Sequence, residues 1–319
     1  MTKASHAPHI PVLFKEVLTH AAVREGALWV DCTLGRGGHS EGLLRAGARV
    51  IGIDKDPSAL RYCEERLAPF EGSFELIRAD FRSLSKELRS RGITEVDGIL
   101  ADLGVSSPQL DEGSRGFSFM SSGPVDMRMD PERGEPASAW IDRLSELELT
   151  DALRRYGEEP LARPLARAIK RWSAQGGGDT LSLARAIEEA TPAKVRYRNP
   201  KKHPATRSFQ ALRIAVNDEL GELDRALKAS IKCLKPGGRL VVVSFHSLED
   251  RRVKTFFREK SGDIPRGSRH MPMTMPENAL YWFTCPERKP RTPSPGEMDT
   301  NPRARSAKLR YGIRTEHEV

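Results

Sequence analysis

A glycine-rich turn between two apolar segments that each end in an acid is the part of this sequence best suited to chemistry. One apolar run ends in Asp31, the turn carries Gly35, Gly37 and Gly38, and the next apolar run ends in Asp54. Glycines let a ligand approach the backbone, and the helix that follows presents free N–H groups. An acid at the end of the second run is placed to accept hydrogen bonds from two ribose hydroxyls. The pattern predicts a nucleotide-cofactor site.

The spacing of this turn bears on which cofactor binds. A dinucleotide fingerprint reads G-x-G-x-x-G, whereas this turn reads G-x-G-G and has Asp31 four positions before its first glycine. An acid there repels a pyrophosphate but suits the ammonium of an amino acid. S-adenosylmethionine carries an amino group and a sulfonium and no phosphate. The turn thus favours S-adenosylmethionine, while Asp54 and the glycines keep an NAD-dependent oxidoreductase open as an alternative.

The composition is that of a soluble globular protein with a basic surface. The 319 residues are 38% hydrophobic and 30% charged, with a net charge of +8. Positive charge gathers, with no intervening carboxylate, at Lys194, Arg196, Arg198, Lys201, Lys202 and Arg207. This clustering predicts a polyanionic partner, against the simpler alternative of a merely basic surface. Without a long apolar run or a signal-like N-terminus, we expect a cytoplasmic protein with no membrane contact.

The four cysteines give no sign of a metal site. Cys32, Cys63, Cys233 and Cys285 are far apart and lack C-x-x-C spacing. Neither a zinc site nor a disulfide framework is predicted, and we expect reduced thiols.

Short apolar runs that alternate with helical patterns must position the turn. The runs lie at residues 28–32, 50–53, 74–77 and 96–101, with helix-like segments after Ser40, Pro57 and Ser83. This alternation predicts an α/β fold with a doubly wound parallel sheet that binds ligands at the carboxyl ends of its strands. Four acids fall at those ends: Asp31, Asp54, Asp80 and Asp102.

The pattern changes after Asp102. Residues 104–136 are rich in Gly, Ser, Pro and Asp and predict a long ordered loop, and helical patterns follow around 161–172 and 183–187. We therefore expect an inserted loop and helical subdomain over residues 107–205, within a main domain formed by residues 1–106 and 206–319. The apolar helix faces of the insert could pair with a second copy, giving a homodimer, or pack on the main domain.

The sheet is predicted to resume in the last third of the chain. Apolar spacing indicates one long helix from Ser208 to Ile231, which ends at the Lys-Pro-Gly-Gly turn of residues 235–238. A buried strand over 240–245, a helix over 248–260 and a final strand over 308–315 follow, with an extra strand expected at 280–284.

Several long motifs resemble one known family. They are residues 102–110 (DLGVSSPQL), 115–120 (RGFSFM), 126–130 (DMRMD), 203–210 (HPATRSFQ), 244–251 (SFHSLEDR) and 301–306 (NPRARS). In this order they resemble the ribosomal RNA small subunit methyltransferase H family, also called MraW. The resemblance runs from about residue 9 to residue 310. The turn at 235–238 is likewise similar to the turn before the fifth strand of class I methyltransferases.

That resemblance implies a fold and a reaction. The expected fold is a class I, Rossmann-like methyltransferase with a helical insert. The expected reaction is methyl transfer from S-adenosylmethionine to the exocyclic N4 of a cytidine at the decoding centre of 16S rRNA, within an assembled small subunit. The cofactor-binding residues that the resemblance implies are Gly37, Gly38, His39, Asp54, Phe81, Asp102 and Gln109. Phe81 would pack against adenine, or serve as an ordinary core aromatic.

The catalytic candidate is Asp102. Cytosine N4 is a poor nucleophile because its lone pair is delocalised into the ring, so the enzyme must align it with the methyl–sulfur bond. Asp102 would accept a hydrogen bond from the amino group, or orient the methionine end of the cofactor. No strong base is required, because the proton leaves after N4 has gained its methyl group.

Substrate RNA would be held by basic and aromatic residues. The candidates are Arg115, Phe117, Arg128, Lys201, Lys202, Arg207, His246, Arg303 and Arg305. Phe117 would stack on the flipped base, although such an aromatic more often anchors its loop to the core. His246 would touch the base or play a structural part. A noncatalytic RNA-binding protein remains an alternative that rests on the basic clusters.

Overall fold

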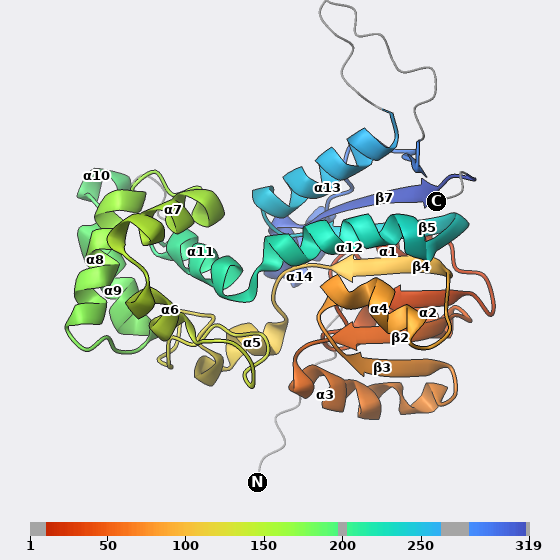
Figure 1. Ribbon diagram of the computed structural model, residues 1–319, viewed down its shortest axis with the longest axis horizontal. Helices are drawn as coiled ribbons and strands as arrows, with labels where there is room; N and C mark the ends of the chain where they lie inside the picture. The colour runs from red at the N-terminus through yellow and green to blue at the C-terminus, as the bar shows by residue number, and fades with distance from the viewer. Residues whose placement is uncertain (1–10, 197–202, 263–280, 317–319) are drawn as a thin grey trace, which may run out of the picture. The chain divides into compact units, whose positions relative to one another are not determined.

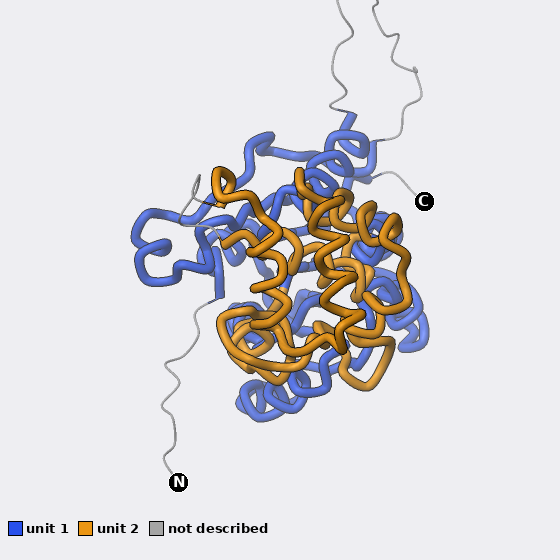
Figure 2. Tube along the Cα trace, turned by 90° about the vertical axis from the view of Figure 1, so that its left-hand side faces the viewer, with its two compact units in different colours: residues 1–104, 221–319 blue, residues 105–220 orange. Residues whose placement is uncertain are grey.

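The chain folds into two compact units (Figure 2). The computed structural model describes residues 11–196, 203–262 and 281–316. The first unit, residues 1–104 and 221–319, holds the sheet, and the second, residues 105–220, is the insertion between its two parts. The inserted unit therefore extends to residue 220, beyond the expected boundary at 205.

One seven-stranded sheet organises the first unit (Figure 1). Its strand order is β3-β2-β1-β4-β5-β7-β6, with β1 to β5 parallel, β7 antiparallel to β5, and β6 antiparallel to β7. The strands are β1 Leu28–Asp31, β2 Arg49–Asp54, β3 Phe74–Arg78, β4 Val96–Asp102, β5 Leu234–Ser244, β6 Phe283–Thr284 and β7 Lys308–Arg314. The predicted doubly wound, mostly parallel sheet and its final strand are confirmed, and the structure adds that β6 and β7 run antiparallel to their neighbours.

Both faces of this sheet are buried, as a doubly wound fold requires. Along β1, Trp29 belongs to one apolar cluster and the next residue, Val30, to the other. The covering helices are α1 Phe14–Ala21, α2 Gly38–Arg45, α3 Pro57–Leu67, α4 Leu84–Arg89, α12 Glu219–Cys233 and α13 Ser247–Lys260, whereas the short helix α14 Pro295–Thr300 has no buried residue. Trp29 packs so closely on β4 that a Cβ added to Gly98 would lie 2.2 Å from its ring.

The Lys-Pro-Gly-Gly turn lies inside the bounds of β5. Leu234 pairs with Val96 and Arg239 with Gly98, so residues 235–238 form a bulge opposite β4. Gly237 takes a positive φ of 78°, a conformation that suits glycine. The turn expected from the sequence is present, but Leu234, the residue before it, already belongs to β5.

The second unit is helical with its own apolar core. Its helices are α5 Ser107–Asp111, α6 Ala137–Arg143, α7 Glu146–Gly157, α8 Ala162–Ala174, α9 Thr180–Ala190, α10 Ala193–Arg196 and α11 Thr206–Asn217. A capping box between Ser145 and Glu148 begins α7. The buried faces of α8 and α9, including Leu165, Ile169 and Ile187, fill this core. These apolar faces are therefore used within the unit itself.

The single helix expected over residues 208–231 is wrong, because the chain forms α11 and α12 instead. Asp218 separates them in the left-handed conformation, with a φ of 48°. The Asn217 side chain donates to the carbonyl of Met127 and accepts from the N–H of Met129, which fixes the end of α11. Asn and Asp tolerate such a break better than other residues with side chains. In the described ranges, no helix is long and apolar enough to cross a membrane.

Candidate active site

The glycine turn leads directly from β1 into α2. Gly37 is the N-cap of α2 with a φ of 69°, and an added Cβ would lie 2.9 Å from Sγ of Cys63. At Gly38 an added Cβ would lie 2.3 Å from Cγ of Pro11. Both glycines are therefore required by neighbouring protein atoms. Their predicted role beside a cofactor stays a prediction.

Asp31 holds the turn in place through side-chain hydrogen bonds. Its side chain is 1% exposed and accepts hydrogen bonds from Oγ of Ser40, at 2.7 Å, and from the N–H of Thr33, at 3.1 Å. Burial raises the pKa of this carboxyl group, and the hydrogen bond from Ser40 works against the rise. Both oxygens are thus engaged inside the protein, and Asp31 serves to hold the first turn of α2.

Asp54 ends β2 beside the same turn. Its carboxylate accepts from the N–H of Gly35 at 2.8 Å and from the N–H of Asp56 at 2.9 Å. Burial raises the pKa of Asp54 to about 6, although the two backbone hydrogen bonds oppose the rise. Each carboxylate oxygen keeps a second lone pair, which is available to a ribose hydroxyl.

His39 and Asp102 form the centre of the site. His39 is 5% exposed, its ring stacks on Phe14 with centroids 6.0 Å apart, and Nε2 lies 3.4 Å from Oδ2 of Asp102. Among the described residues, neither ring nitrogen of His39 nor Oδ1 of Asp102 has a hydrogen-bond partner. The backbone of Asp102 is fixed by a 2.6 Å hydrogen bond from its N–H to Oγ1 of Thr33. Buried polar atoms without partners are rare, and a ligand bound here would supply the missing partners.

A buried ionic cluster, which no pattern in the sequence predicts, lies after β2 and β3. Nζ of Lys55 donates to both carboxylate oxygens of Glu222 at 2.9 Å and lies 3.4 Å from Oδ1 of Asp80. Burial raises the pKa of Glu222, which shares a hydrogen bond with Asp80. The pKa of Asp80 is lowered despite its burial, by that hydrogen bond and by the charge of Lys55. The cluster joins α12 to the strand ends next to Asp54.

Phe81 and Gln109 are the remaining cofactor candidates. Phe81 begins a short 3-10 helix, Phe81–Ser83, and is half-buried against the sheet core, so part of its ring remains accessible. Gln109 lies in the second unit, where it is 6% exposed and its Oε1 accepts the N–H of Ser106 in the capping box of α5. The first unit thus brings together the turn, His39, Asp54, Phe81 and Asp102.

Three of the predicted RNA-binding residues hold the long loop together. The guanidinium of Arg115 donates to the carbonyls of Arg128 and Met129, at 3.1 and 2.9 Å. Arg128 makes a bidentate ion pair with Asp126, with N···O distances of 2.8 and 2.7 Å. Phe117 is 6% exposed in the core of the second unit, which corrects its expected role as a base-stacking residue. The alternative interpretation of Phe117, as an anchor of the loop, fits this position.

The other RNA candidates differ in exposure. Arg207 is half-buried and donates to the carbonyl of Glu158. His246 caps α13, its Nδ1 accepting the N–H of Glu249 at 3.4 Å, in agreement with the structural alternative for this residue. Arg303 and Arg305 are exposed on the 3-10 helix Pro302–Ser306. Lys201 and Lys202 lie outside the described residues.

The site fits a cofactor that has a ribose and a charged amino-acid end. Asp54 offers carboxylate lone pairs at the end of β2, and Asp102 offers a buried oxygen without a partner at the end of β4. Carboxylates attract an ammonium or sulfonium group and repel a pyrophosphate. These two carboxylates therefore suit S-adenosylmethionine better than a dinucleotide.

The chain is similar to several proteins that carry names. A protein named ribosomal RNA small subunit methyltransferase H from Methylobacterium nodulans is 48% identical over 98% of this chain and 92% of its own length. One of the same name from Carboxydothermus hydrogenoformans is 47% identical over 95% of this chain and 96% of its own. Among solved structures, an rRNA methylase from Streptococcus thermophilus is 12% identical over 97% of this chain and 99% of its own, with a TM-score of 0.41.

A family model matches the chain as well. The model of the MraW methylase family covers residues 6–314, almost the whole chain. Since the match spans both units and relatives are close to half identical along their full lengths, this chain belongs to the MraW methylase family.

Proposed function

We propose that this protein transfers a methyl group from S-adenosylmethionine to the exocyclic N4 of a cytidine in 16S rRNA, at the decoding centre of the small ribosomal subunit. As a methylase, the chain uses S-adenosylmethionine as its methyl donor. Relatives named ribosomal RNA small subunit methyltransferase H support RNA of that subunit as the substrate. The single structural observation that carries the proposal is the buried oxygen of Asp102 without a partner, beside the glycine turn.

The cofactor would be held by residues at the carboxyl edge of the sheet. Asp54 accepts from the ribose hydroxyls, and Phe81 packs its accessible ring face on the adenine. Gly37 and His39 belong to the turn that lies against the amino-acid end. Gly38 and Gln109 complete the set that family resemblance implies. When bound, the cofactor supplies a methyl group on a positively charged sulfonium.

Asp102 acts on the nucleophile. Its free oxygen accepts a hydrogen bond from the amino group of cytosine, which draws the nitrogen lone pair out of conjugation with the ring and holds N4 in line for attack. The new N–C bond forms as the C–S bond breaks, and N4 then carries a positive charge. That nitrogen is acidic, so its proton passes to water or to Asp102 without a strong base. In the alternative role, Asp102 orients the amino group of the cofactor.

The target base must leave its stack before it can reach Asp102. An assembled small subunit is the proposed substrate, because several RNA segments build its decoding centre together, and the reaction then takes place in the cytoplasm. Arg303 and Arg305, exposed beside β7, are the best placed of the predicted cations to contact phosphates. A homodimer stays a prediction that sedimentation analysis would test.

The test is methyl transfer itself. Small subunits that lack the modification are incubated with the protein and S-adenosylmethionine carrying a labelled methyl group, and the RNA is digested to nucleosides for mass analysis. Labelled N4-methylcytidine is the expected product. Label on another atom or nucleotide would overturn the proposed specificity. Cofactor binding without transfer would exclude this substrate, and failure to bind the cofactor would favour a noncatalytic RNA-binding protein.

A further inference from the structure

Residues 11–14, at the start of α1, form a strap against the first turn of α2. Cγ of Pro11 lies so close to Gly38 that a Cβ added to this glycine would be 2.3 Å away. The ring of Phe14 stacks on the ring of His39, with centroids 6.0 Å apart. The strap therefore contacts α2 at two residues, Gly38 and His39, that are proposed to lie beside the cofactor.

The backbone of the strap is held in a rare conformation. Leu13 has a φ of 55° and a ψ of 33°, in the left-handed region that bulky side chains seldom adopt. Its side chain is fully buried in the apolar cluster that also contains Ala304. Strained residues of this kind persist only where the surrounding structure holds them, and they gather at functional sites. Leu13 therefore needs a partner that fixes its backbone.

Glu297 is such a partner. Its Oε1 accepts the N–H of Leu13 at 2.7 Å, although the two residues are 284 positions apart in the sequence. Glu297 is half-buried on α14, a six-residue helix without a buried residue. The carbonyl of Glu297 accepts the N–H of Asn301 at 2.7 Å, and Ala304 then enters the cluster that contains Leu13. The motif at residues 301–306 thus attaches α14 to the first unit, where its carboxylate meets the strap.

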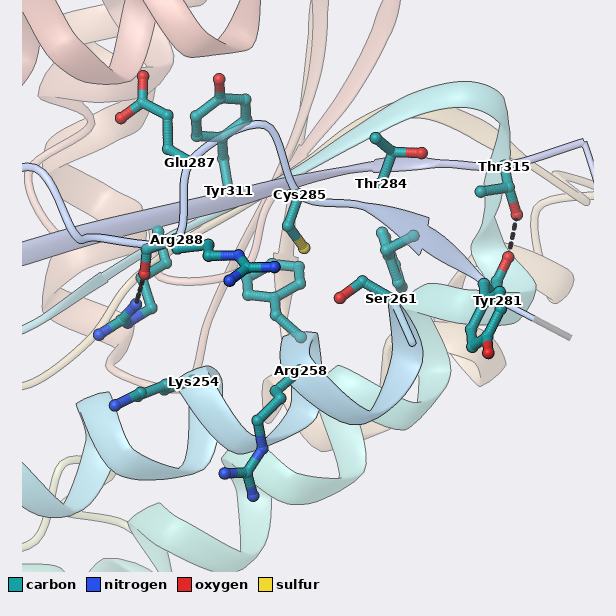
Figure 3. A pocket seen from close by; sticks show the side chains of 13 residues that line it. Lys254, Arg258, Ser261, Tyr281, Thr284, Cys285, Glu287, Arg288, Tyr311 and Thr315 are labelled. Atoms are coloured by element: carbon teal, nitrogen blue, oxygen red, sulfur yellow. Dashed lines mark hydrogen bonds between the residues drawn. The ribbon is translucent and has the colours of Figure 1, made fainter. Parts of the chain in front are cut away.

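The far end of α1 is fixed separately. The ring of His20 stacks on Tyr311 of β7, with centroids 4.2 Å apart, and the carbonyl of His20 accepts from Arg239 at 2.8 Å. Tyr311 lines an open groove beside α13 (Figure 3). Val17, in the middle of α1, is fully buried. Loss of the hydrogen bond at Leu13 should therefore loosen the strap and leave the rest of α1 in place.

We propose that Glu297 is a positioning residue for the cofactor site, and that it acts through its hydrogen bond to Leu13. This bond holds the strap, and the strap holds the first turn of α2, which carries Gly38 and His39. The inference rests on the proposed role of this turn in binding the cofactor. It adds a residue from the last part of the chain, which acts on the cofactor only through the strap.

The first experiment measures the affinity of the full-length protein for S-adenosylmethionine by calorimetry. Glu297→Ala leaves the N–H of Leu13 without this acceptor, whereas Glu297→Gln keeps an amide oxygen at the same position. Asp299→Ala is the control, because it removes a carboxylate from an exposed position on the same helix. We expect Glu297→Ala to weaken binding roughly tenfold, the lower end of what a hydrogen bond to a charged group contributes. Glu297→Gln should recover most of this affinity, and Asp299→Ala should match the wild type.

A double-mutant cycle separates positioning from a general loss of stability. Pro11→Ala removes the close contact of the strap with Gly38 and leaves the acceptor for Leu13 in place. The effects of independent sites multiply to within about twofold, whereas the effects of residues that act through one element do not. We expect Pro11→Ala to weaken cofactor binding, and the double variant Pro11→Ala/Glu297→Ala to bind little worse than Glu297→Ala alone.

Hydrogen exchange follows the strap directly. Peptides that contain residues 11–14 are measured by mass spectrometry with and without S-adenosylmethionine. If Glu297 favours the strap conformation that binds the cofactor, the cofactor must favour this conformation by the same factor. We expect faster exchange of the strap in Glu297→Ala, and renewed protection when the cofactor binds. Asp299→Ala should exchange like the wild type.

The outcomes separate this inference from the proposed reaction. Wild-type cofactor affinity or wild-type strap exchange in Glu297→Ala, or effects that multiply in the cycle, would overturn the role of Glu297. Wild-type affinity in Pro11→Ala would also overturn it, and this test holds even where Glu297→Ala fails to fold. Expected results for the strap in a protein that forms no N4-methylcytidine would instead reject the proposed reaction and leave the positioning role standing.

Discussion

Nε2 of His39 lies 3.4 Å from Oδ2 of Asp102, so the first turn of α2 contacts the end of β4 through two polar side chains. The ring of His39 is held by Phe14 and the backbone of Asp102 by Thr33, and both supports are independent of a ligand. The contact is close without being a hydrogen bond as it stands, and a small rotation of either side chain would let a proton on Nε2 engage Oδ2 and leave Oδ1 for the amino group of the substrate. His39 is then a positioning residue for Asp102.

Replacement of Asp102 tests the acceptor. Asp102→Asn keeps the shape but loses the negative charge, and we expect kcat to fall roughly 10²–10³-fold, the effect of removing one well-placed electrostatic group. The measurement is transfer of labelled methyl groups alongside cofactor binding by calorimetry. Unchanged cofactor affinity with low kcat supports contact with the substrate, whereas weakened cofactor binding supports the alternative role. A wild-type rate with normal cofactor binding would exclude both roles.

Replacement of His39 tests the positioning role. His39→Phe preserves an aromatic ring against Phe14 but removes the nitrogens, and His39→Gln restores one N–H donor. A hydrogen bond to a charged group contributes about 1.5–3 kcal/mol, so kcat should fall roughly 10–150-fold in His39→Phe, with partial recovery in His39→Gln. Steady-state kinetics measure kcat and KM separately. Equal activity in the two variants would indicate that His39 acts by packing alone.

The pKa of Asp54, about 6, predicts how cofactor binding varies with pH. The ionised carboxylate is the better acceptor for ribose hydroxyls, so cofactor affinity should fall as pH drops below about 6. Because this pKa lies above its ordinary value of 3.8, the contribution of Asp54 to the free energy of unfolding decreases as pH rises between these values.

Calorimetric titration at several pH values between 5 and 8 measures the effect. Asp54→Asn serves as the control, since it has no charge to lose there. We expect the variant to bind the cofactor more weakly, with a flatter dependence on pH. If the variant shows the same pH dependence as the wild type, a group other than Asp54 causes the pH dependence of cofactor binding.

Gly37 should tolerate alanine less well than a glycine of similar conformation elsewhere. Gly37→Ala and Gly72→Ala both place a Cβ on a residue of positive φ, 69° and 82°, which costs about 1–2 kcal/mol in each. Only at position 37 does the added Cβ also meet Sγ of Cys63, at 2.9 Å. Denaturant unfolding should show the larger loss of stability for Gly37→Ala, together with weaker cofactor binding. Equal losses would contradict the packing argument.

Ala22 offers a stabilising substitution. It ends α1 in the left-handed conformation, with a φ of 44°, and its side chain is exposed. Ala22→Gly removes this strain, but glycine also gives the unfolded chain more conformational freedom, which opposes the gain. We expect a net increase of about 0.5–1 kcal/mol in the free energy of unfolding. Ala46→Gly, at the end of α2 with a φ of −83°, should destabilise the protein instead. Denaturant titration of both variants measures the contrast.

The sheet could be predicted from the sequence because its signals are local. β1, β2 and β4 contain short apolar runs, and Asp31, Asp54 and Asp102 stand at their ends as expected. The break at Asp218 could not be predicted in this way, because apolar spacing continues through it and its cause is a hydrogen bond from Asn217 to the distant Met127.

Side-chain roles were harder to predict than positions. The pairing of Lys55 with Glu222 joins residues far apart in the chain, and no local pattern indicates it. Their residue type makes Arg115 and Arg128 candidates for phosphate binding. In the structure, however, Arg115 donates to backbone carbonyls and Arg128 pairs with Asp126. A charge count cannot tell a cation that binds a partner from one that folds a loop.

The pairing of β4 with β5 has a consequence for the synthesis of the protein. Asp102 pairs with Val243, and the whole second unit lies between them in the chain. Because translation adds about 5–20 residues per second, the edge of β4 stays unpaired on the order of ten seconds until β5 has been synthesised. An unpaired edge is a site of aggregation, and its protection depends on the second unit folding promptly around its own core, which shortens the loop that β5 must close.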